Sequence, residues 1–341
     1  NNSPRRGRHE RVDDVGADVS HPDVGRVLAG KYELQALAGT GGMAEVFRAV
    51  TRGAEGFRRD VAVKRILPEL TENAEFVAMF VEEARVQATL AHPNVVQIHD
   101  FDRDEDGGFF LVAELVDGAT LLQWRNGHVA IGEAPPWHLV AAIGIEVLKG
   151  LSAAHENVDR QGRKVPVYHR DVTPQNILLG RRGHIKLTDF GLARAMDRAR
   201  MTRPDIVKGK LSYLAPELTD GRDPSAQSDL FGVGIVLWEA LAQRKLFDAE
   251  SPFDVLQQVK NADVPPLASL RDDVPRSLRE AIHRALQRDP AARFRSARSM
   301  VRALANLLRM TPESTSAEVL GRSVRRVLRH RPSSAAPANA S

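Results

Sequence analysis

The chain has 341 residues, 43% of them hydrophobic and 27% charged, a composition that excludes a wholly disordered or fibrous protein and fits roughly two globular domains. It contains no cysteine, which excludes disulfides, thiolate zinc sites and a cysteine nucleophile and is compatible with the reducing cytoplasm, where we expect the protein. The net charge of +4 lies in residues 309–341, with six Arg and two Glu, so the rest of the chain gives no support to nucleic-acid binding.

The first half of the chain is rich in predicted strands. Residues 1–31 are polar and aperiodic and are expected to form a flexible leader. Beyond them, short apolar runs separated by Gly-rich or charged turns predict strands, and one run with helical spacing predicts a helix at Glu75–Leu90. The predicted strands are Tyr32–Leu37, Ala44–Ala49, Val61–Ile66, Val95–Phe101 and Phe109–Leu115.

After about Gly118 the pattern becomes mostly helical, which predicts a small strand-rich lobe followed by a larger helical lobe. The helices expected there are Trp137–Asn157, Leu230–Gln243, Ser277–Gln287 and Ala297–Leu308.

Residues 309–341 form a basic tail rich in Pro, Ser and Ala. Within it, one helix is expected at Ala317–Arg329. Over Gly321–Arg331 a helix would have apolar residues on one face and Arg on the other, a pattern that suits an anionic membrane surface or an acidic groove. We expect this helix to form only on contact with a partner; the alternative is a solvated, frayed tail. No apolar run reaches the ~18 residues of a membrane-spanning helix, so membrane contact is expected only through the tail.

A glycine-rich turn joins two of the predicted strands. Glycine lets backbone N–H groups approach the phosphates of a ligand, which a Cβ would obstruct. No Gly-Lys-Ser/Thr follows, so the turn is not a Walker loop, and the strand after it excludes a Rossmann turn. A plain hairpin is the alternative for this turn taken alone. Its residues are Gly39-Thr40-Gly41-Gly42-Met43-Ala44-Glu45-Val46.

Lys64 stands at the end of the apolar run Val61-Ala62-Val63. A lysine in such a strand is either an edge residue or a functional charge with a partner. The next predicted helix offers Glu83, and its neighbour Glu82, as acidic partners. A solvated lysine is the alternative, and the remaining motifs disfavour it.

Two further motifs carry acidic and amide side chains. The first sets Asp171 and Asn176 five residues apart on a loop that Pro174 stiffens, just before an apolar strand. The second is the end of a strand, Leu187-Thr188-Asp189-Phe190-Gly191. Each short motif could arise by chance, but the order and spacing of all four leave little room for chance.

Together these motifs resemble those of the eukaryotic-like protein kinase superfamily, above all the Hanks-type bacterial serine/threonine kinases, whose glycine-rich loops commonly read Gly-x-Gly-Gly-Met. The resemblance covers about residues 32–308. Ala91-His92-Pro93-Asn94 follows Glu83 at the family's spacing, which favours Glu83 over Glu82. Ala113–Gly118 resembles the hinge that receives adenine, and Ala215-Pro216-Glu217 the end of the activation segment.

The resemblance implies an α+β fold, the bilobal protein kinase fold. A small antiparallel β-sheet N-lobe with one main helix would span residues 32–117, and a larger, mostly helical C-lobe residues 118–308. Asp229 resembles the aspartate of the central buried helix, and Arg293 the arginine that pairs with Glu217.

Functional roles carry over to the matching residues. Asp171 would orient the hydroxyl of a protein substrate and accept its proton. Lys64 would hold the α- and β-phosphates of ATP while Glu83 orients it, and Asn176 and Asp189 would coordinate Mg²⁺. The other residues expected to contact ATP are Leu37, Gly39, Thr40, Gly41, Gly42, Met43, Ala44, Glu45, Val46, Ala62, Glu114, Val116 and Leu178.

Three departures from the family pattern qualify this match. Ala44 replaces the usual third glycine of the loop, with a modest effect expected on nucleotide binding. Ala113 stands at the gatekeeper position, which predicts an enlarged pocket behind adenine. Thr173 replaces the usual catalytic-loop lysine, while Lys210 stands after Gly209 where the family usually has threonine.

We interpret the third departure as a compensating exchange. The ammonium group of Lys210 would lie beside Asp171 and the γ-phosphate, and the hydroxyl of Thr173 would supply the lost hydrogen bond. The alternative is that Lys210 points to solvent.

The expected function is therefore a serine/threonine protein kinase that autophosphorylates, through self-association and at Thr202. The alternative is a pseudokinase, a nucleotide-binding scaffold without turnover, which Thr173 favours and the otherwise intact set of motif residues opposes. Tyrosine specificity is disfavoured because the catalytic loop lacks that class's Arg pattern. A small-molecule kinase would generally lack the Ala-Pro-Glu motif and the Glu217–Arg293 pair.

Overall fold

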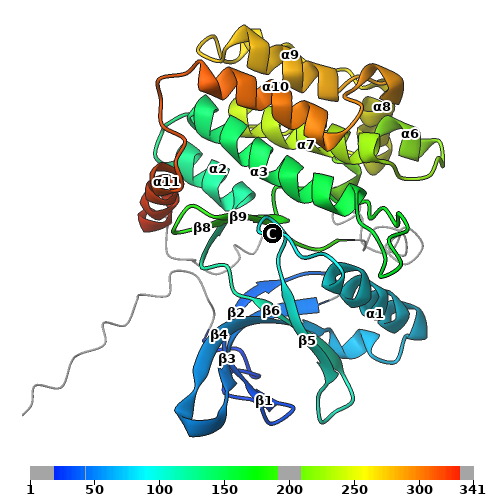
Figure 1. Cartoon of the computed structure of the whole chain (residues 1–341), viewed down its shortest axis with the longest axis vertical. Helices are drawn as coiled ribbons and strands as arrows, with labels where there is room; N and C mark the ends of the chain where they lie inside the picture. The colour runs from blue at the N-terminus through cyan, green and yellow to red at the C-terminus, as the bar shows by residue number, and fades with distance from the viewer. Residues whose placement is uncertain (1–18, 43, 191–208, 331–341) are drawn as a thin grey trace, which may run out of the picture.

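A six-stranded antiparallel sheet, in the order β1-β2-β3-β4-β6-β5, forms the N-lobe of the computed structural model, which describes residues 19–42, 44–190 and 209–330. This lobe occupies the lower half of Figure 1. Its elements are β1 (Val27–Leu28), β2 (Tyr32–Thr40), β3 (Ala44–Arg52), β4 (Arg58–Ile66), α1 (Ala74–Ala88), β5 (Ile98–Arg103) and β6 (Phe109–Glu114).

The two faces of this sheet bury different sets of side chains. One face closes on itself around Phe47 and Phe110, both fully buried. The other face packs on α1 through a cluster that includes Ile66 and Ala113. Lys64 pairs in register with Val46 on one side and Leu111 on the other. Because directly opposed residues share a face, all three side chains lie on the α1 side, where the two lobes meet.

The C-lobe is built around α3 and α7 and fills the upper half of Figure 1. Nearly every residue of α7 is buried, and Ser225 caps its start with a side chain that accepts the N–H of Ser228. By length and apolar composition α3 could span a membrane, but most of its residues are buried in this core. The helices are α2 (Leu121–Ala130), α3 (Trp137–His155), α6 (Pro216–Thr219), α7 (Ala226–Ala242), α8 (Pro252–Asn261), α9 (Arg276–Ala285), α10 (Ala297–Arg309) and α11 (Ala317–Arg329).

A small three-stranded sheet lies where the lobes join (Figure 1). It consists of β7 (Gly118–Thr120), β8 (Ile177–Gly180) and β9 (Ile185–Leu187), all antiparallel. At Gly118, strands β7 and β8 approach so closely that a Cβ on this residue would stand 1.9 Å from the carbonyl oxygen of Leu179. The sheet therefore holds β7, which follows the hinge, against β8, which begins after Asn176. On its other side β8 pairs with β9, which ends before Asp189.

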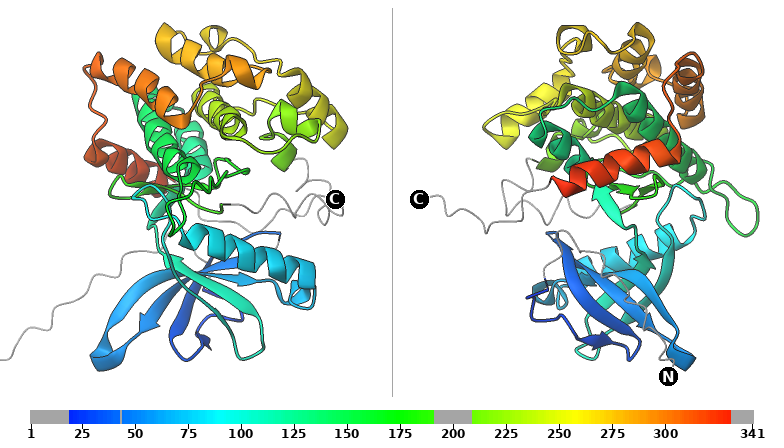
Figure 2. Two further views of the ribbon diagram at one scale, coloured as in Figure 1. Left: turned by 45° about the vertical axis from the view of Figure 1, so that its right-hand side comes forward. Right: turned by 90° about the vertical axis from the view of Figure 1, so that its left-hand side faces the viewer.

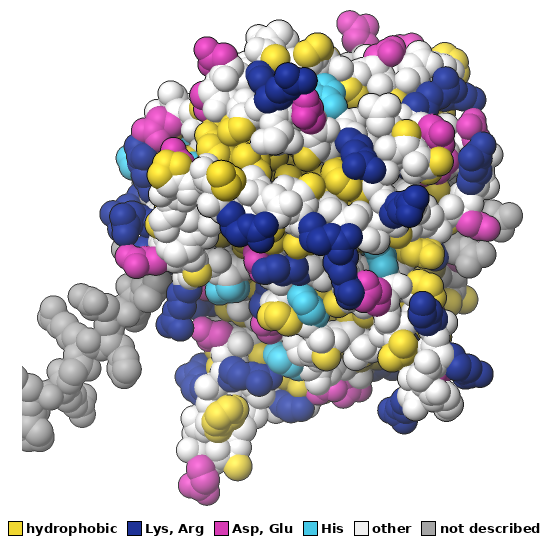
Figure 3. Space-filling model, turned by 45° about the horizontal axis from the view of Figure 1, so that its top comes forward, with side chains coloured by type: hydrophobic (Ala, Val, Ile, Leu, Met, Phe, Trp, Pro, Cys, Tyr) yellow, Lys and Arg dark blue, Asp and Glu magenta, His cyan; other side chains and the backbone are white. Residues whose placement is uncertain are grey.

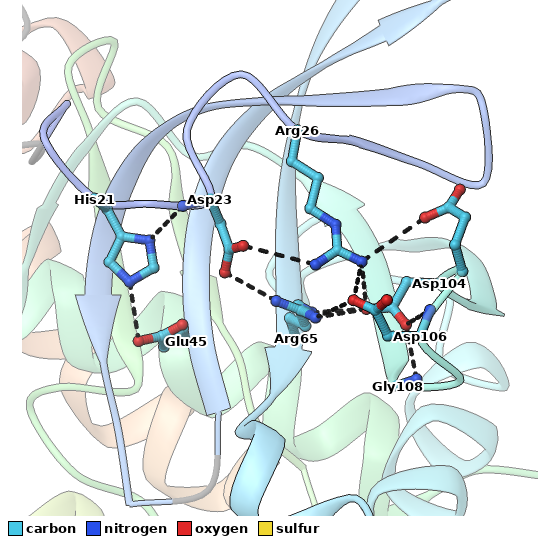
Figure 4. Close-up of polar contacts among 9 residues, drawn as sticks. His21, Asp23, Arg26, Glu45, Arg65, Asp104, Asp106 and Gly108 are labelled. Atoms are coloured by element: carbon cyan, nitrogen blue, oxygen red, sulfur yellow. Dashed lines mark hydrogen bonds and ion pairs between the residues drawn. The ribbon is translucent and has the colours of Figure 1, made fainter.

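The expectation of a flexible leader up to residue 31 is wrong for residues 19–31. Val27–Leu28 pairs with β2 as strand β1. Before it, Asp23 accepts a hydrogen bond of 2.9 Å from Arg65, and Arg26 donates one of 2.5 Å to Asp106 (Figure 4). Arg65 is itself buried against Asp104. The leader is ordered here because it covers a buried ion pair that would otherwise be incompletely satisfied.

The expectation for the tail is also wrong, because α11 folds on the chain's own C-lobe. The helix has the predicted bounds, but its apolar face packs against α2, β7 and β8 instead of awaiting a partner. Figure 2 shows it lying along the C-lobe next to the boundary with the N-lobe. Its buried residues are Leu320, Gly321, Val324, Val327 and Leu328.

Polar contacts fix the seat of α11. The indole Nε1 of Trp124 donates to the hydroxyl of Ser323 at 2.9 Å. Arg325 donates to the carbonyl oxygen of Arg181, and Arg326 pairs with Glu133. Consequently this face is no longer free to insert into a membrane. On the C-lobe face in Figure 3, basic side chains lie among acidic and hydrophobic ones.

Candidate active site

The ammonium group of Lys64 joins the two lobes. Its Nζ lies 2.9 Å from Oε1 of Glu83 on α1 and 2.9 Å from Oδ1 of Asp189, just beyond β9. Glu83 faces the core, with a side chain 2% exposed, whereas the side chain of Glu82 is 67% exposed. The structure thus brings Lys64 together with the expected partner.

Burial and charge act against each other in this triad. Burial disfavours the ammonium form of Lys64, but the two carboxylates outweigh it and hold the pKa of Lys64 above its usual value. Burial raises the pKa of Glu83 to about 7, even though Lys64 acts to lower it. Burial acts likewise on Asp189, but Lys64 holds the pKa of Asp189 below its usual value. Asp189 therefore carries the negative charge that a cation would need.

Asp171 and Asn176 lie together on the loop before β8. The amide nitrogen of Asn176 donates to the main-chain oxygen of Asp171 at 2.9 Å and to its Oδ2 at 3.1 Å. Because the Asn176 nitrogen is engaged in this way, its oxygen is the atom left to bind a cation. Asn176 and Asp189 thus offer oxygen ligands suited to Mg²⁺, which fits the expected metal pair.

His169 ties this loop to the strand that carries Asp189. Its Nε2 lies 3.0 Å from the carbonyl oxygen of Thr188, and its Nδ1 accepts the N–H of Asp171 at 3.3 Å. A carbonyl can only accept, so Nε2 carries the proton and the ring is neutral. Burial lowers the pKa of His169, which agrees with this neutral form. Phe190 packs on the ring, 4.5 Å between centroids.

The residues expected around adenine line the junction of the lobes. The N–H of Glu114 is engaged by the carbonyl of Gln97 at 3.0 Å, whereas that of Val116 has no hydrogen-bond partner among the described residues. Val116 and Leu178 both pack against the cluster that holds Ala44 and Ala113. Ala62 lies opposite Ala113 in the sheet. The N–H of Val116 is thus left open among apolar side chains of both lobes, an environment that suits adenine.

Two side chains of the predicted nucleotide site, those of Leu37 and Glu45, lie away from it, which contradicts the prediction for both. Leu37 stands opposite Phe47 and packs against the core on the other face of the sheet, so the prediction that its side chain contacts the nucleotide is wrong. Met43 lies outside the described residues. In the loop, the N–H of Gly41 donates to the carbonyl of Ala44 at 2.8 Å, which closes the turn. Gly39, Thr40 and Gly42 are exposed there, as is required of main chain that covers a ligand.

The side chain of Glu45 also lies away from the cleft. Its Oε1 is 3.4 Å from Nε2 of His21 in the leader (Figure 4). His21, Glu45 and Asp23 hold ligand atoms within 4.8 Å of one another. However, Asp23 already pairs with Arg65 at 2.9 Å and with Arg26 at 3.7 Å. These two guanidinium groups oppose a metal cation there, so we assign the cluster a structural role.

Lys210 reaches the catalytic loop, as the exchange hypothesis requires. Its Nζ lies 2.8 Å from Oδ2 of Asp171. Thr173 is buried in the catalytic loop, but among the described residues its hydroxyl makes no hydrogen bond to Asp171. The cationic half of the exchange is present and the expected hydrogen bond of Thr173 is not.

The segment that ends in Ala215-Pro216-Glu217 is anchored as predicted. Arg293 donates to both carboxylate oxygens of Glu217, at 2.8 and 2.7 Å, and is almost fully buried. Asp229 of α7 accepts the N–H of His169 at 2.9 Å and lies 2.8 Å from Nε2 of His155. Both buried pairs fix the substrate side of the site. Thr202, the expected phosphorylation site, lies outside the described residues.

Sequence reasoning missed two ion pairs beside the hinge. Lys186 of β9 lies 2.5 Å from Oε1 of Glu114, and Arg181 lies 3.0 Å from Oδ1 of Asp117. The main-chain N–H of Arg181 also donates to the carbonyl of Asp117 at 2.8 Å. No spacing rule links residues 64 or more positions apart. The pairing of β7 with β8 and of β8 with β9 brings them together.

Known proteins match this architecture over most of the chain. The family model "Protein kinase domain" matches residues 32–304. The tyrosine-protein kinase MasK of Myxococcus xanthus is 37% identical over 297 residues, covering 86% of this chain and 45% of MasK. The serine/threonine-protein kinase PknA of Mycobacterium tuberculosis is 35% identical over 281 residues, covering 81% of this chain and 61% of PknA.

The structural likeness agrees with these relatives. The kinase domain of Mycobacterium tuberculosis PknI has a TM-score of 0.60 and 27% sequence identity, over 83% of this chain and 98% of that domain. The chain spans 45% of the length of MasK and 61% of PknA. Because the family model, the two-lobed fold and the joined motif residues agree, this chain belongs to the protein kinase family.

Proposed function

We propose that the protein is an ATP-dependent protein kinase that phosphorylates serine and threonine hydroxyls, including its own. The observation that carries the proposal is the triad of Lys64, Glu83 and Asp189, assembled across the two lobes with both ion pairs at 2.9 Å. A scaffold without turnover would have no need of this buried, charged arrangement, which is costly to maintain. The family's serine/threonine members, such as PknA, supply the substrate class by analogy.

Phosphoryl transfer requires positioning more than covalent work by the protein. In the proposed reaction, Asp171 orients the substrate hydroxyl and accepts its proton as the hydroxyl oxygen bonds to the γ-phosphorus. The bond from that phosphorus to the bridging oxygen breaks, and its electron pair stays on ADP. Lys64 holds the α- and β-phosphates, and the hinge amide of Val116 receives adenine.

Asn176 and Asp189 would hold Mg²⁺. When bound, the metal neutralises the charge of the phosphates and polarises them. The fit rests on the oxygen of Asn176 that its nitrogen contacts leave open and on the charge that Lys64 maintains on Asp189.

Tyrosine is the second candidate substrate, because MasK, named as a tyrosine-protein kinase, is among the relatives. Incubation with labelled Mg-ATP, followed by phosphoamino-acid analysis of the protein and of a serine, threonine and tyrosine peptide set, distinguishes the two. We expect phosphoserine and phosphothreonine, all lost in Asp171→Ala. Phosphotyrosine alone would contradict the proposed specificity, and no transfer with intact ATP binding would favour the pseudokinase.

Autophosphorylation within the activation segment is part of the proposal and implies self-association. Arg170 precedes the catalytic aspartate, and its buried Nε has no hydrogen-bond partner among the residues described. A phosphate on Thr202 would bring about −1.5 to −2 charge and strong acceptors for this guanidinium. Peptide mapping of active protein tests the site. We place the reaction in the cytoplasm, where ATP and reducing conditions suit a chain without cysteine.

A further inference from the structure

Two donors among the described residues contact the carboxylate of Asp171, and both contact Oδ2. Nζ of Lys210 lies at 2.8 Å and the amide nitrogen of Asn176 at 3.1 Å. Among the described residues neither contact engages Oδ1, which leaves that oxygen to accept the proton of an incoming hydroxyl. Lys210 is thus the cation at the catalytic base.

We propose that Lys210 supplies the cation that this catalytic loop lacks at Thr173, and that docking of the segment containing Gly209–Glu217 inserts it. This inference rests on the proposed kinase function and deepens it. Lys210 belongs to the segment that Glu217 anchors on Arg293. The same segment would therefore bind the substrate and place the positive charge of Lys210 beside Asp171.

The charge is needed in the transition state. As the γ-phosphoryl group passes from ADP to the substrate hydroxyl, its negative charge spreads over the equatorial oxygens while the proton moves to Asp171. Lys210 contributes only its charge to this step and neither gains nor loses an atom. A preorganised donor at such a position is worth about 10²–10³ in kcat.

A buried network holds Lys210 in place. The N–H of Tyr213 donates to the carbonyl oxygen of Lys210 at 3.1 Å. The Tyr213 hydroxyl donates to Oε2 of Glu239 in α7 at 2.7 Å, and Arg125 reaches the same oxygen at 3.0 Å. Burial, together with Glu239, raises the pKa of Tyr213, so the hydroxyl remains a donor. Tyr213 is therefore a positioning residue for Lys210.

The first experiment removes the cation. Lys210→Ala should lower kcat about 100-fold or more while the KM for ATP and the affinity for ADP change less than twofold; Lys210→Arg should recover part of the loss. Lys260→Ala is the matched control, because its Nζ lies 3.0 Å from an aspartate, Asp220, on the exposed C-lobe surface. Tm of each variant reports folding. If Lys210→Ala, folded and binding ADP, keeps the kcat of wild type, the proposal is wrong.

The second experiment moves the cation back to the catalytic loop. Thr173→Lys alone should impair kcat, because two cations would compete for one carboxylate. Thr173→Lys combined with Lys210→Thr should exceed either Lys210→Thr or Thr173→Lys in kcat. A combined variant that folds and binds ADP but is no better than these single variants would overturn the exchange.

Tyr213→Phe tests the route by which Lys210 is positioned. It should lower kcat in the wild-type background, with little change in the KM for ATP, and should have no effect on kcat in the combined variant, whose cation comes from residue 173. Equal losses in both backgrounds would assign Tyr213 a purely structural role and contradict this step. Failure of wild type to transfer phosphate at all would instead refute the kinase function.

Discussion

Asp229 holds the backbone of Arg170 in a left-handed conformation. Its Oδ1 accepts the N–H of Arg170 at 2.8 Å, and the φ of Arg170 is 67°. For a residue with a Cβ this conformation costs of the order of 1–3 kcal/mol and persists only where the surroundings impose it. Since Asp171 comes next, the direction of the catalytic carboxylate depends on a buried aspartate 58 positions away in α7.

Asp229→Asn should weaken both stability and catalysis. One carboxylate oxygen would become an NH₂ group that faces another donor. At the Oδ1 position that donor is the N–H of Arg170. At the Oδ2 position the NH₂ group would face the N–H of His169 and the ring of His155. Leaving such buried donors unpaired costs about 1–3 kcal/mol. Urea unfolding should show this loss, and kcat should fall with it.

Asp220→Asn is the control for that prediction. Asp220 is exposed, and in the described part of the chain its side chain pairs across the surface with Lys260. Exposed pairs contribute about 0–1 kcal/mol. Equal unfolding midpoints for Asp229→Asn and Asp220→Asn would contradict the role given to Asp229.

Glu83→Gln should raise the free energy of unfolding in a pH-dependent way while it lowers kinase activity. Burial raises the pKa of Glu83 to about 7, above the ordinary value of about 4.3 for the unfolded chain. The folded protein therefore binds this proton more tightly, and the stabilisation is complete below pH ~4.3 and is lost as pH rises through 7. Glutamine stays neutral, so the variant should gain stability relative to wild type between pH 5 and 8.

The same variant should lose kinase activity, because a neutral amide orients the ammonium of Lys64 less firmly than a carboxylate at 2.9 Å. Denaturation curves at pH 5 and 8, together with the KM for ATP and kcat, test both halves. A stability difference that does not change with pH would show that Glu83 does not titrate in this range.

Ala113→Met should narrow the nucleotide site. Ala113 lies directly opposite Ala62 in the sheet and is 6% exposed, next to the cluster of α1. Because each of these residues carries only a methyl group, we expect room behind adenine that a methionine would fill. We expect wild type to bind ADP analogues with a bulky group on the exocyclic amine, and Ala113→Met to lose this binding at least 10-fold while binding ADP itself within a few-fold. Calorimetry with both ligands is the measurement; equal affinities of both proteins for the bulky analogue would exclude the enlarged pocket.

The parts of the fold with strong local signals could be predicted from the sequence. The helix at Ala297–Arg309 is a case, and so is α11, where a helix was expected at Ala317–Arg329. The apolar spacing over Gly321–Arg331 identified its apolar face but placed its start and end too late. The helix α2 was missed, although Thr120 and Gln123 form the capping box that marks its start. The strand β1 has two residues and no periodicity, so only its pairing with β2 makes it a strand.

In the candidate active site, too, the residues with a strong local sequence signal could be predicted. Catalytic residues on spaced motifs were predictable, because the family pattern fixes their type and order. The position of Leu37 was not, because irregularities in the pairing of β2 with β3 on both sides of Leu37 decide which face the side chain takes. The docking of α11 was also out of reach, since the amphipathic pattern identifies an apolar face but not the surface that covers it.

Gly321→Leu should release α11 from the C-lobe. A Cβ at Gly321 would lie 2.6 Å from the carbonyl oxygen of Arg181, a main-chain atom that cannot turn aside. Overpacking of this kind costs about 1–3 kcal/mol or more, so the helix should lift away, exposing Val324 and Leu328. Arg181 also pairs with Asp117 beside the hinge, and we therefore expect the KM for ATP to rise about two- to fivefold.

The amides of residues 317–329 in Gly321→Leu should lose their protection against hydrogen exchange. Arg322→Leu is the control, because Arg322 is exposed and its partner among the described residues is Glu318 on the same helix, at 2.9 Å. Protection that survives in Gly321→Leu would mean that α11 does not dock through this contact, whereas lost protection with an unchanged KM would confine its role to stability.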